Sequence, residues 1–135
     1  MTKAQKSRLC KMAIEAMKDS YSPYSNFKVG AALLCEDGRI FTGCNVENLS
    51  YSATICAERV AVYKAVSEGT RRFTAIAVAG GEGGAIAGRV TPCGVCRQVL
   101  YEFCDRDMPV LVVTLPDGTF EEYTMGQLLP EAFEF

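Results

Sequence analysis

The segment FTAIAVA (residues 73–79) is a continuous apolar run with the length of a buried β-strand. A mostly apolar stretch at 55–68 precedes it, and we expect that stretch to form a buried helix. Downstream, Thr91 followed by Pro92 predicts another helix start, with threonine as the N-cap and proline as the first helical residue. A second apolar run follows at 110–114. A strand, a crossover helix and a further strand predict a parallel βαβ unit with helices packed on the sheet.

The flanking sequence predicts the outer elements of the same sheet. Apolar residues at helical spacing predict an amphipathic helix over 3–19, and the turn residues at 21–26 end it. The other predicted features are two hairpin strands, a glycine-rich loop, a last strand and a short last helix, at 27–35, 39–46, 80–88, 119–123 and 124–127. We therefore expect a single α/β domain over 1–135, a three-layer α/β/α sandwich with a mixed sheet of about five strands.

The composition is that of an ordinary globular protein and argues against several functions. The chain has 135 residues, with 14 basic and 16 acidic side chains and a net charge of −2, so we expect no nucleic-acid surface. No apolar run approaches the length of a membrane span, and MTKAQKSRL at the N-terminus is not a signal peptide. Seven cysteines without a secretory signal argue against a disulfide framework. We expect a cytoplasmic protein.

Three of the cysteines have the spacing of a metal site. Cys93 and Cys96 form a C-x-x-C motif, and Cys56 lies at another expected helix start. Cys56 and Cys93 each follow a threonine by two residues, and we expect Thr54 and Thr91 to be the N-caps. Free N–H groups at a helix N-terminus lower the pKa of a thiol, and the thiolate is the form that binds metal. Three sulfurs predict a zinc site with a fourth position for water.

Other roles for these cysteines stay open at this point. A structural zinc site would need a fourth cysteine, and a redox dithiol at C-x-x-C would leave Cys56 without a role. The four remaining cysteines lie in apolar or periodic stretches, and we expect them to be small buried thiols: Cys10, Cys35, Cys44 and Cys104. Glu58 favours an open site, because a carboxylate is costly to bury on a helix unless it serves a zinc-bound water.

Several longer motifs point to one family. C-A-E at 56–58, followed by P-C-x-x-C at 92–96, is the cysteine form of the zinc nucleobase deaminase signature. The further motifs are PYSNFKVGAA at 23–32, GCNVEN at 43–48, CAER at 56–59, PCGVCRQ at 92–98 and LLPEAF at 128–133. Together they span nearly the whole chain, and they resemble the small homotetrameric cytidine deaminases that bind zinc through three cysteines. The chain contains no histidine, which fits that subclass.

The resemblance implies an activity and a cofactor. The activity is the zinc-dependent hydrolytic deamination of cytidine and 2′-deoxycytidine to uridine and 2′-deoxyuridine, with release of ammonia, in pyrimidine salvage. The resemblance implies one Zn²⁺ per chain bound by Cys56, Cys93 and Cys96, with Glu58 as the catalytic proton shuttle. It also implies a nucleoside and water as partners, and a homotetramer.

The resemblance further assigns residues to the substrate. Phe27 packs against the pyrimidine, and the backbone near Ala57 helps to hold the base. Asn45 and Glu47 receive the ribose. Strand alternation places these two side chains on one face of the second hairpin strand, with Val46 on the other. From pattern alone, Asn45 and Glu47 read as polar strand-end residues and Phe27 as a core residue.

Four more residues have expected roles: two at the subunit interface, and two that offset the negative charge of the zinc site. By resemblance, Tyr51 and Phe133 complete the site of a neighbouring subunit. Three thiolates around Zn²⁺ leave a net charge of −1, and Arg59 and Arg97 lie beside the expected ligands. We expect both arginines to donate N–H···S hydrogen bonds that offset this charge.

Three other functions fit the sequence less well. A deaminase for a nucleoside-like antibiotic such as blasticidin S is disfavoured by the intact Asn45-Val46-Glu47, which fits a free sugar. Editing of a polynucleotide is disfavoured by the acidic charge balance. A structural zinc or interaction module is disfavoured by Glu58 and by the open fourth ligand position.

Overall fold

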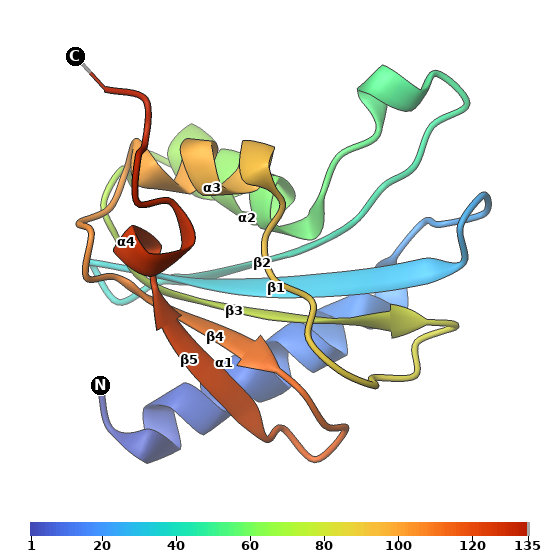
Figure 1. Ribbon diagram of the computed structural model, residues 1–135, viewed down its shortest axis with the longest axis horizontal. Coiled ribbons are helices and arrows are strands. Elements are labelled where there is room, and N and C mark those ends of the chain that lie inside the picture. Colours follow the sequence, from blue (N-terminus) through green and yellow to red (C-terminus); the bar gives the residue numbers. More distant parts are fainter. Residues whose placement is uncertain (135) are drawn as a thin grey trace.

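A computed structural model describes residues 1–134 and shows a five-stranded sheet with helices on both faces (Figure 1). The strands lie in the order β2-β1-β3-β4-β5. Strands β3 and β4 are parallel, and every other neighbouring pair is antiparallel. The strands are β1 Phe27–Cys35, β2 Ile40–Cys44, β3 Phe73–Glu82, β4 Pro109–Val113 and β5 Phe120–Thr124. The predicted α/β class with a mixed five-stranded sheet is confirmed.

The central strand β3 is apolar because helices cover both of its faces. The helix α1, Lys3–Ala16, lies on one face, while α2, Ala57–Ser67, and α3, Gly94–Tyr101, lie on the other (Figure 1). Ile76 and Val78 pack with residues of α2, and the alternating alanines of β3 pack with residues of α1. A strand buried on both faces needs apolar residues at every position, which explains the continuous run in the sequence.

Two glycines let the helices approach the sheet closely. A Cβ atom at Gly30 in β1 would lie 2.1 Å from the backbone oxygen of Ala13 in α1. A Cβ atom at Gly43 in β2 would lie 2.4 Å from the backbone oxygen of Ala57, the first residue of α2. Real Cβ atoms do not approach other atoms so closely, so both positions require glycine. The contact at Gly43 fixes the start of α2 against the sheet.

The remaining helical segments are short. They are the 3₁₀ turns η1, Met17–Asp19, and η2, Tyr51–Ala53, and the helix α4, Met125–Leu128. Reciprocal hydrogen bonds between Thr124 and Gln127 confirm the predicted capping box of α4. Among residues 1–134, none of the helices has the length and apolar character of a membrane-spanning segment.

The cysteines outside the motifs behave largely as expected. Cys10, Cys35 and Cys104 are buried, whereas Cys44 is only half-buried. Burial raises the pKa of Cys10 to about 12 and that of Cys104 to about 11. These thiols therefore stay protonated and unreactive at neutral pH.

The predicted starts of α2 and α3 are wrong by two residues. Cys56 and Cys93 are themselves the N-caps, in place of Thr54 and Thr91. Before α2 the chain is still extended, because the Ile55 N–H donates to the Val46 carbonyl at 3.0 Å and the Ile55 carbonyl accepts from the Val46 N–H at 3.0 Å. Before α3, the Thr91 hydroxyl accepts a hydrogen bond from a guanidinium group and does not cap the helix.

The strand bounds also differ from expectation, by one residue in β4 and β5 and by more than one residue at two places. β3 continues to Glu82, so the first residues of the predicted glycine-rich loop are strand, because they pair with β1 as far as Phe27. β2 ends at Cys44 and not at residue 46. Asn45 still donates its backbone N–H to the Val29 carbonyl of β1 at 3.2 Å, but its own carbonyl turns to the Tyr21 N–H at 3.0 Å, so the strand pairing ends there.

Candidate metal centre and active site

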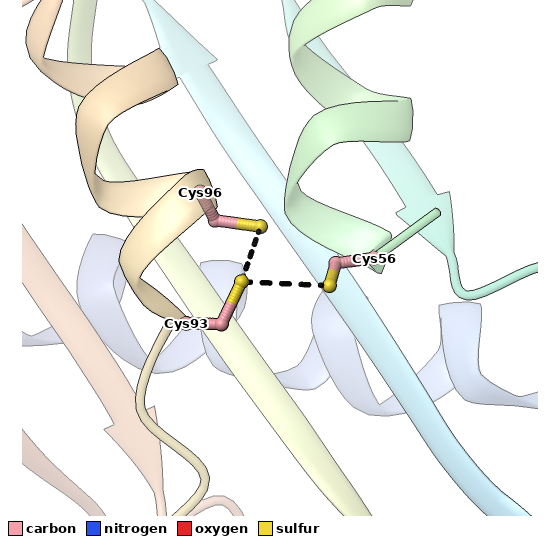
Figure 2. Close-up of side chains that lie close together, drawn as sticks. All are labelled: Cys56, Cys93 and Cys96. Carbon is pink, nitrogen blue, oxygen red and sulfur yellow. Dashed lines mark hydrogen bonds between the residues drawn. The ribbon is translucent and has the colours of Figure 1, made fainter. Parts of the chain in front are cut away.

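Two helix N-termini bring three sulfur atoms together (Figure 2). Cys56 comes from the N-cap of α2, Cys93 from the N-cap of α3, and Cys96 from the first turn of α3. The Cys56 and Cys93 sulfurs are 3.7 Å apart, and the Cys93 and Cys96 sulfurs are 3.5 Å apart. All three lie within 4.8 Å of one another. Zn–S bonds of about 2.3 Å at tetrahedral angles place sulfurs about 3.8 Å apart, so this donor set fits zinc.

The environment of the three sulfurs favours negative charge. Hydrogen bonds from Cys96, Arg59 and Cys93 lower the pKa of Cys56 to about 5, against the opposing effect of burial. The same sharing of a proton with Cys56, together with burial, raises the pKa of Cys96. One of the sulfurs is thus a thiolate at neutral pH even before a cation is considered, and a cation would favour ionisation of all three.

Arg59 lies against this cluster as expected. Its Nη2 atom is 3.6 Å from the Cys56 sulfur. Burial works against the charge of Arg59, yet hydrogen bonds to Cys56 and Cys96 raise its pKa above the usual range. Within residues 1–134, its buried Nε atom has no hydrogen-bond partner. A half-buried guanidinium beside three sulfurs could offset the net negative charge of a three-thiolate zinc site.

The hydrogen bonds recorded for Arg97 differ from the expected bond to sulfur. Its guanidinium donates to the Pro92 carbonyl at 2.7 Å, to the Leu128 carbonyl at 2.6 Å and to the Thr91 hydroxyl at 3.2 Å. Oxygen is a better hydrogen-bond acceptor than sulfur, and the segment before α3 places two oxygens, the Pro92 carbonyl and the Thr91 hydroxyl, next to the guanidinium. Arg97 therefore ties the segment that carries Cys93 to the end of α4.

Glu58 is buried beside the sulfur cluster. It is the second residue of α2 and is only 3% exposed. Burial, followed by the neighbouring Cys56, raises the pKa of the Glu58 carboxyl from its ordinary 4.5 to about 7. A carboxyl group with this pKa holds a proton about half of the time at neutral pH, which suits a group that must both accept and donate one.

A cavity of about 250 Å³ connects the cluster to residues distant in the sequence. Its lining includes most of the residues assigned to substrate or chemistry: Phe27, Asn45, Glu47, Ala57, Glu58, Cys56 and Cys93. These residues come from the start of β1, the segment after β2 and the starts of α2 and α3. A single pocket therefore joins a buried carboxyl group, two of the sulfurs, an aromatic ring and two polar side chains.

The Asn45 amide is held mainly by backbone groups. Its Nδ2 donates to the Phe27 carbonyl at 2.7 Å, and its Oδ1 accepts from the Val29 N–H at 2.9 Å and from the Ser20 hydroxyl at 2.5 Å. Asn45 lies just beyond β2, so strand alternation does not determine where its side chain points. The three hydrogen bonds determine its position.

The Glu47 carboxylate is held by the loop before β1. Its Oε1 accepts the Tyr24 N–H at 2.9 Å and the Ser25 N–H at 3.2 Å, and its Oε2 accepts the Ser25 hydroxyl. The hydrogen bond from the Ser25 hydroxyl is the main reason why the pKa of Glu47 lies below its ordinary value. Glu47 is therefore an ionised acceptor at the edge of the pocket.

Comparison with known proteins identifies the family. The model described as "Cytidine and deoxycytidylate deaminase zinc-binding region" matches residues 3–112. The chain belongs to this family. It is 54% identical over 119 residues to a cytidine deaminase of Sporosarcina psychrophila, covering 88% of this chain and 84% of that protein. It is 49% identical over 125 residues to one of Halalkalibacterium halodurans, covering 93% and 91%.

Solved structures of family members have the same fold. A crystal structure of cytidine deaminase from Burkholderia pseudomallei superposes with a TM-score of 0.85 at 44% identity, covering 98% of this chain and 100% of that one. The cytidine deaminase structure from Mycobacterium tuberculosis has a TM-score of 0.81 at 39% identity and covers 100% of both chains. The resemblance drawn from the sequence motifs is confirmed.

Two residues assigned to substrate binding by the deaminase resemblance do not line this pocket. Tyr51 is 77% exposed on η2, in an arm between β2 and α2 that projects from the body of the protein (Figure 1). Phe133 is 69% exposed, and its backbone exchanges two hydrogen bonds with the Gln98 amide. Their assignment to a neighbouring subunit stays a prediction.

Some pocket residues had no role in the sequence-based assignment. Val29, Ile55 and Val90 supply apolar lining, and Ser25 supplies a hydroxyl. Val29 could have been found, because it shares a strand face with Phe27. Val90 could not, since only the path of the loop after β3 brings it to the pocket.

Proposed function

We propose that this chain is a cytidine deaminase. It would convert cytidine and 2′-deoxycytidine, with water, to uridine and 2′-deoxyuridine plus ammonia, as a step of pyrimidine salvage. The observation that carries the proposal is the position of Glu58, buried with a pKa of about 7 in the same pocket as the Cys56 and Cys93 sulfurs. Two relatives that carry the name cytidine deaminase support the choice of substrate. The whole of 1–135 would form one deaminase domain.

Cys56, Cys93 and Cys96 would hold one zinc ion per chain. Three protein ligands leave a fourth position on a tetrahedral ion. A zinc ion in such a site supplies Lewis acidity that brings the pKa of water to about 7. Arg59 would keep the sulfurs from carrying too much uncompensated charge, because its guanidinium contacts the Cys56 sulfur.

Glu58 would carry the protons of the reaction. In its ionised form it takes a proton from the attacking water and delivers it to N3 of the pyrimidine, which makes C4 electrophilic. The water oxygen bonds to C4. Glu58 then takes the remaining proton from the new C4 hydroxyl and passes it to the amino group, the C4–N bond breaks, and ammonia leaves while C4 becomes a carbonyl carbon. One residue can serve both transfers because the pKa of its carboxyl lies near neutral pH.

The remaining pocket residues would orient the nucleoside. The Phe27 ring would pack on the pyrimidine face, and the backbone at Ala57 would hold the base. Asn45 retains one amide hydrogen beyond its bond to the Phe27 carbonyl, and Glu47 is an ionised acceptor, so the pair suits the hydroxyl groups of a sugar.

The deaminase resemblance carries the proposal of a homotetramer. Leu49 and Tyr51 are both more than three-quarters exposed on the projecting arm, where a neighbouring chain could cover them. A second subunit could then contribute Tyr51 and Phe133 to a neighbouring pocket. Light scattering of the zinc-loaded protein should give a mass near four chains, and Tyr51→Ala should shift it towards smaller species.

We also propose a cytoplasmic location with no nucleic-acid or membrane partner. All seven cysteines are free, which suits a reducing compartment.

The activity is tested by incubating the zinc-loaded protein with cytidine and 2′-deoxycytidine, following the change in ultraviolet absorbance and the release of ammonia. Blasticidin S and a single-stranded oligonucleotide are assayed separately as alternative substrates. We expect turnover of both nucleosides. Deamination of only the antibiotic or only the oligonucleotide would replace the proposal by that activity.

A further inference from the structure

Ser25 links two residues that the proposed function assigns to different parts of the substrate. Its hydroxyl donates to Oε2 of Glu47 and accepts from the Phe27 N–H at 3.0 Å. Its own N–H donates to Oε1 of Glu47 at 3.2 Å. Ser25 also lines the pocket. One side chain thus joins the carboxylate assigned to the sugar and the start of the strand that carries the ring assigned to the base.

We propose that Ser25 is a positioning residue that holds the Glu47 carboxylate and the Phe27 backbone in the arrangement that binds the sugar of the nucleoside. This inference rests on the proposed function and extends it to a residue with no assigned role. Ser25 acts through Glu47 and Phe27, and takes no part in proton transfer at the base.

The loop around Ser25 is itself fixed from both sides. The Asn26 N–H donates to the Ser22 carbonyl at 2.9 Å, and the Asn26 carbonyl accepts from the Gly83 N–H at 2.7 Å. Asn26 adopts a left-handed conformation with φ of 58°, which asparagine tolerates better than most residues. These contacts fix the position of the Ser25 hydroxyl between the start of β1 and the segment after β2.

The hydrogen bonds of Glu47 limit what a ligand can offer it. A carboxylate has about four acceptor positions. Three are occupied, by the Tyr24 N–H, the Ser25 N–H and the Ser25 hydroxyl. The remaining position suits a single donor, such as one sugar hydroxyl. Without the Ser25 hydroxyl, the carboxylate loses its bond at Oε2, and the Phe27 N–H loses its acceptor.

The effect should fall on binding and leave the chemistry largely intact. A contact made equally in the bound substrate and in the transition state changes KM and leaves kcat unchanged. A hydrogen bond to a charged group is worth enough to change affinity by roughly tenfold. Ser25→Ala should therefore raise KM for cytidine about tenfold, with kcat within about twofold of the original.

The experiment uses the zinc-loaded protein and three variants. Ser25→Ala removes the hydroxyl, and Ser25→Thr keeps one. The matched control Ser67→Ala removes an exposed hydroxyl that bonds to the Lys64 carbonyl at the far end of α2. We expect a raised KM only for Ser25→Ala, substantial recovery in Ser25→Thr, and unchanged zinc content and circular dichroism in all three.

Two further measurements separate positioning from a general loss of structure. With 2′,3′-dideoxycytidine, which lacks the ring hydroxyls, Ser25→Ala should change KM much less than with cytidine. In a Glu47→Ala background, Ser25→Ala should add little, because both changes remove the same contact.

The results that overturn the inference are distinct from those that overturn the proposed function. If the wild-type protein does not deaminate cytidine, both the proposed function and this inference are wrong. If the wild type is active and Ser25→Ala behaves like Ser67→Ala, only this inference is wrong. It is also wrong if Ser25→Ala lowers kcat at unchanged KM, affects the dideoxynucleoside as much as cytidine, or adds its full loss to that of Glu47→Ala.

Discussion

Replacing Glu58 by glutamine should destroy activity while stabilising the protein. The amide keeps the shape of the side chain, but it cannot carry a proton between water and the base. General acid–base groups contribute roughly 10²–10⁴-fold to turnover, so kcat should fall by at least about a hundredfold. The zinc content should stay near one ion per chain, because the three sulfurs are untouched.

The gain in stability follows from the burial of Glu58. Its carboxyl has a pKa of about 7 in the folded chain and an ordinary value of 4.5. The folded state therefore binds the proton more tightly, and the free energy of unfolding falls as pH rises from about 4.5 to about 7. At 1.36 kcal/mol per pH unit, the loss amounts to roughly 3 kcal/mol and is complete above pH 7. Glu58→Gln has no such loss.

The measurement is urea denaturation of metal-stripped protein at pH 5 and pH 8. The metal is removed because its positive charge would change the pKa of Glu58. The matched control is Glu68→Gln, an exposed glutamate at the C-cap of the same helix. We expect wild type and Glu68→Gln to lose stability relative to Glu58→Gln between the two pH values. Parallel curves for all three proteins, or a Glu58→Gln variant with more than about a tenth of the original kcat, would refute the reasoning.

Three further predictions concern the metal and the packing. Cys93→Ser should abolish retention of zinc, measured by elemental analysis after dialysis; retention of about one ion per chain would contradict a three-sulfur site. Arg59→Gln should weaken zinc affinity in a chelator competition, and Cys56→His in that background should partly restore it by removing one negative charge; purely additive losses would assign Arg59 to packing. Gly30→Ala should lower the free energy of unfolding by several kcal/mol, because its Cβ would lie 2.1 Å from a backbone oxygen of α1. Gly94→Ala, whose Cβ meets nothing within 4 Å, should change stability by less than about 1 kcal/mol, as urea denaturation of both variants would show.

Local sequence determined the fold class of this protein. The apolar run at 73–79 has the length and composition of a strand buried on both faces, and it lies between helical stretches that serve as crossovers. The spacing of Cys93 and Cys96 places them within one helical turn, so the sequence also predicted that these two sulfurs would lie close together.

The same local reasoning failed where long-range contacts competed with it. Thr54 and Thr91 are good N-caps by propensity, yet pairing of Ile55 with Val46 and the hydrogen bond between Thr91 and Arg97 delay both helices. Propensity is a weak preference worth about 1 kcal/mol at a cap, and tertiary contacts readily override it.

Only the tertiary structure decided how the site is assembled. Cys56 meets Cys93 because α2 and α3 cover the same face of the sheet, and no periodicity along the chain encodes that meeting. The pKa of Glu58 depends on its burial at the start of α2. Arg97 donates hydrogen bonds to two backbone carbonyls, one of them 31 residues away in the sequence. Local sequence specifies helices and strands through short-range spacing and burial pattern. Burial of a single charge and the convergence of distant side chains depend on the whole packed arrangement, and these are the features that set the chemistry.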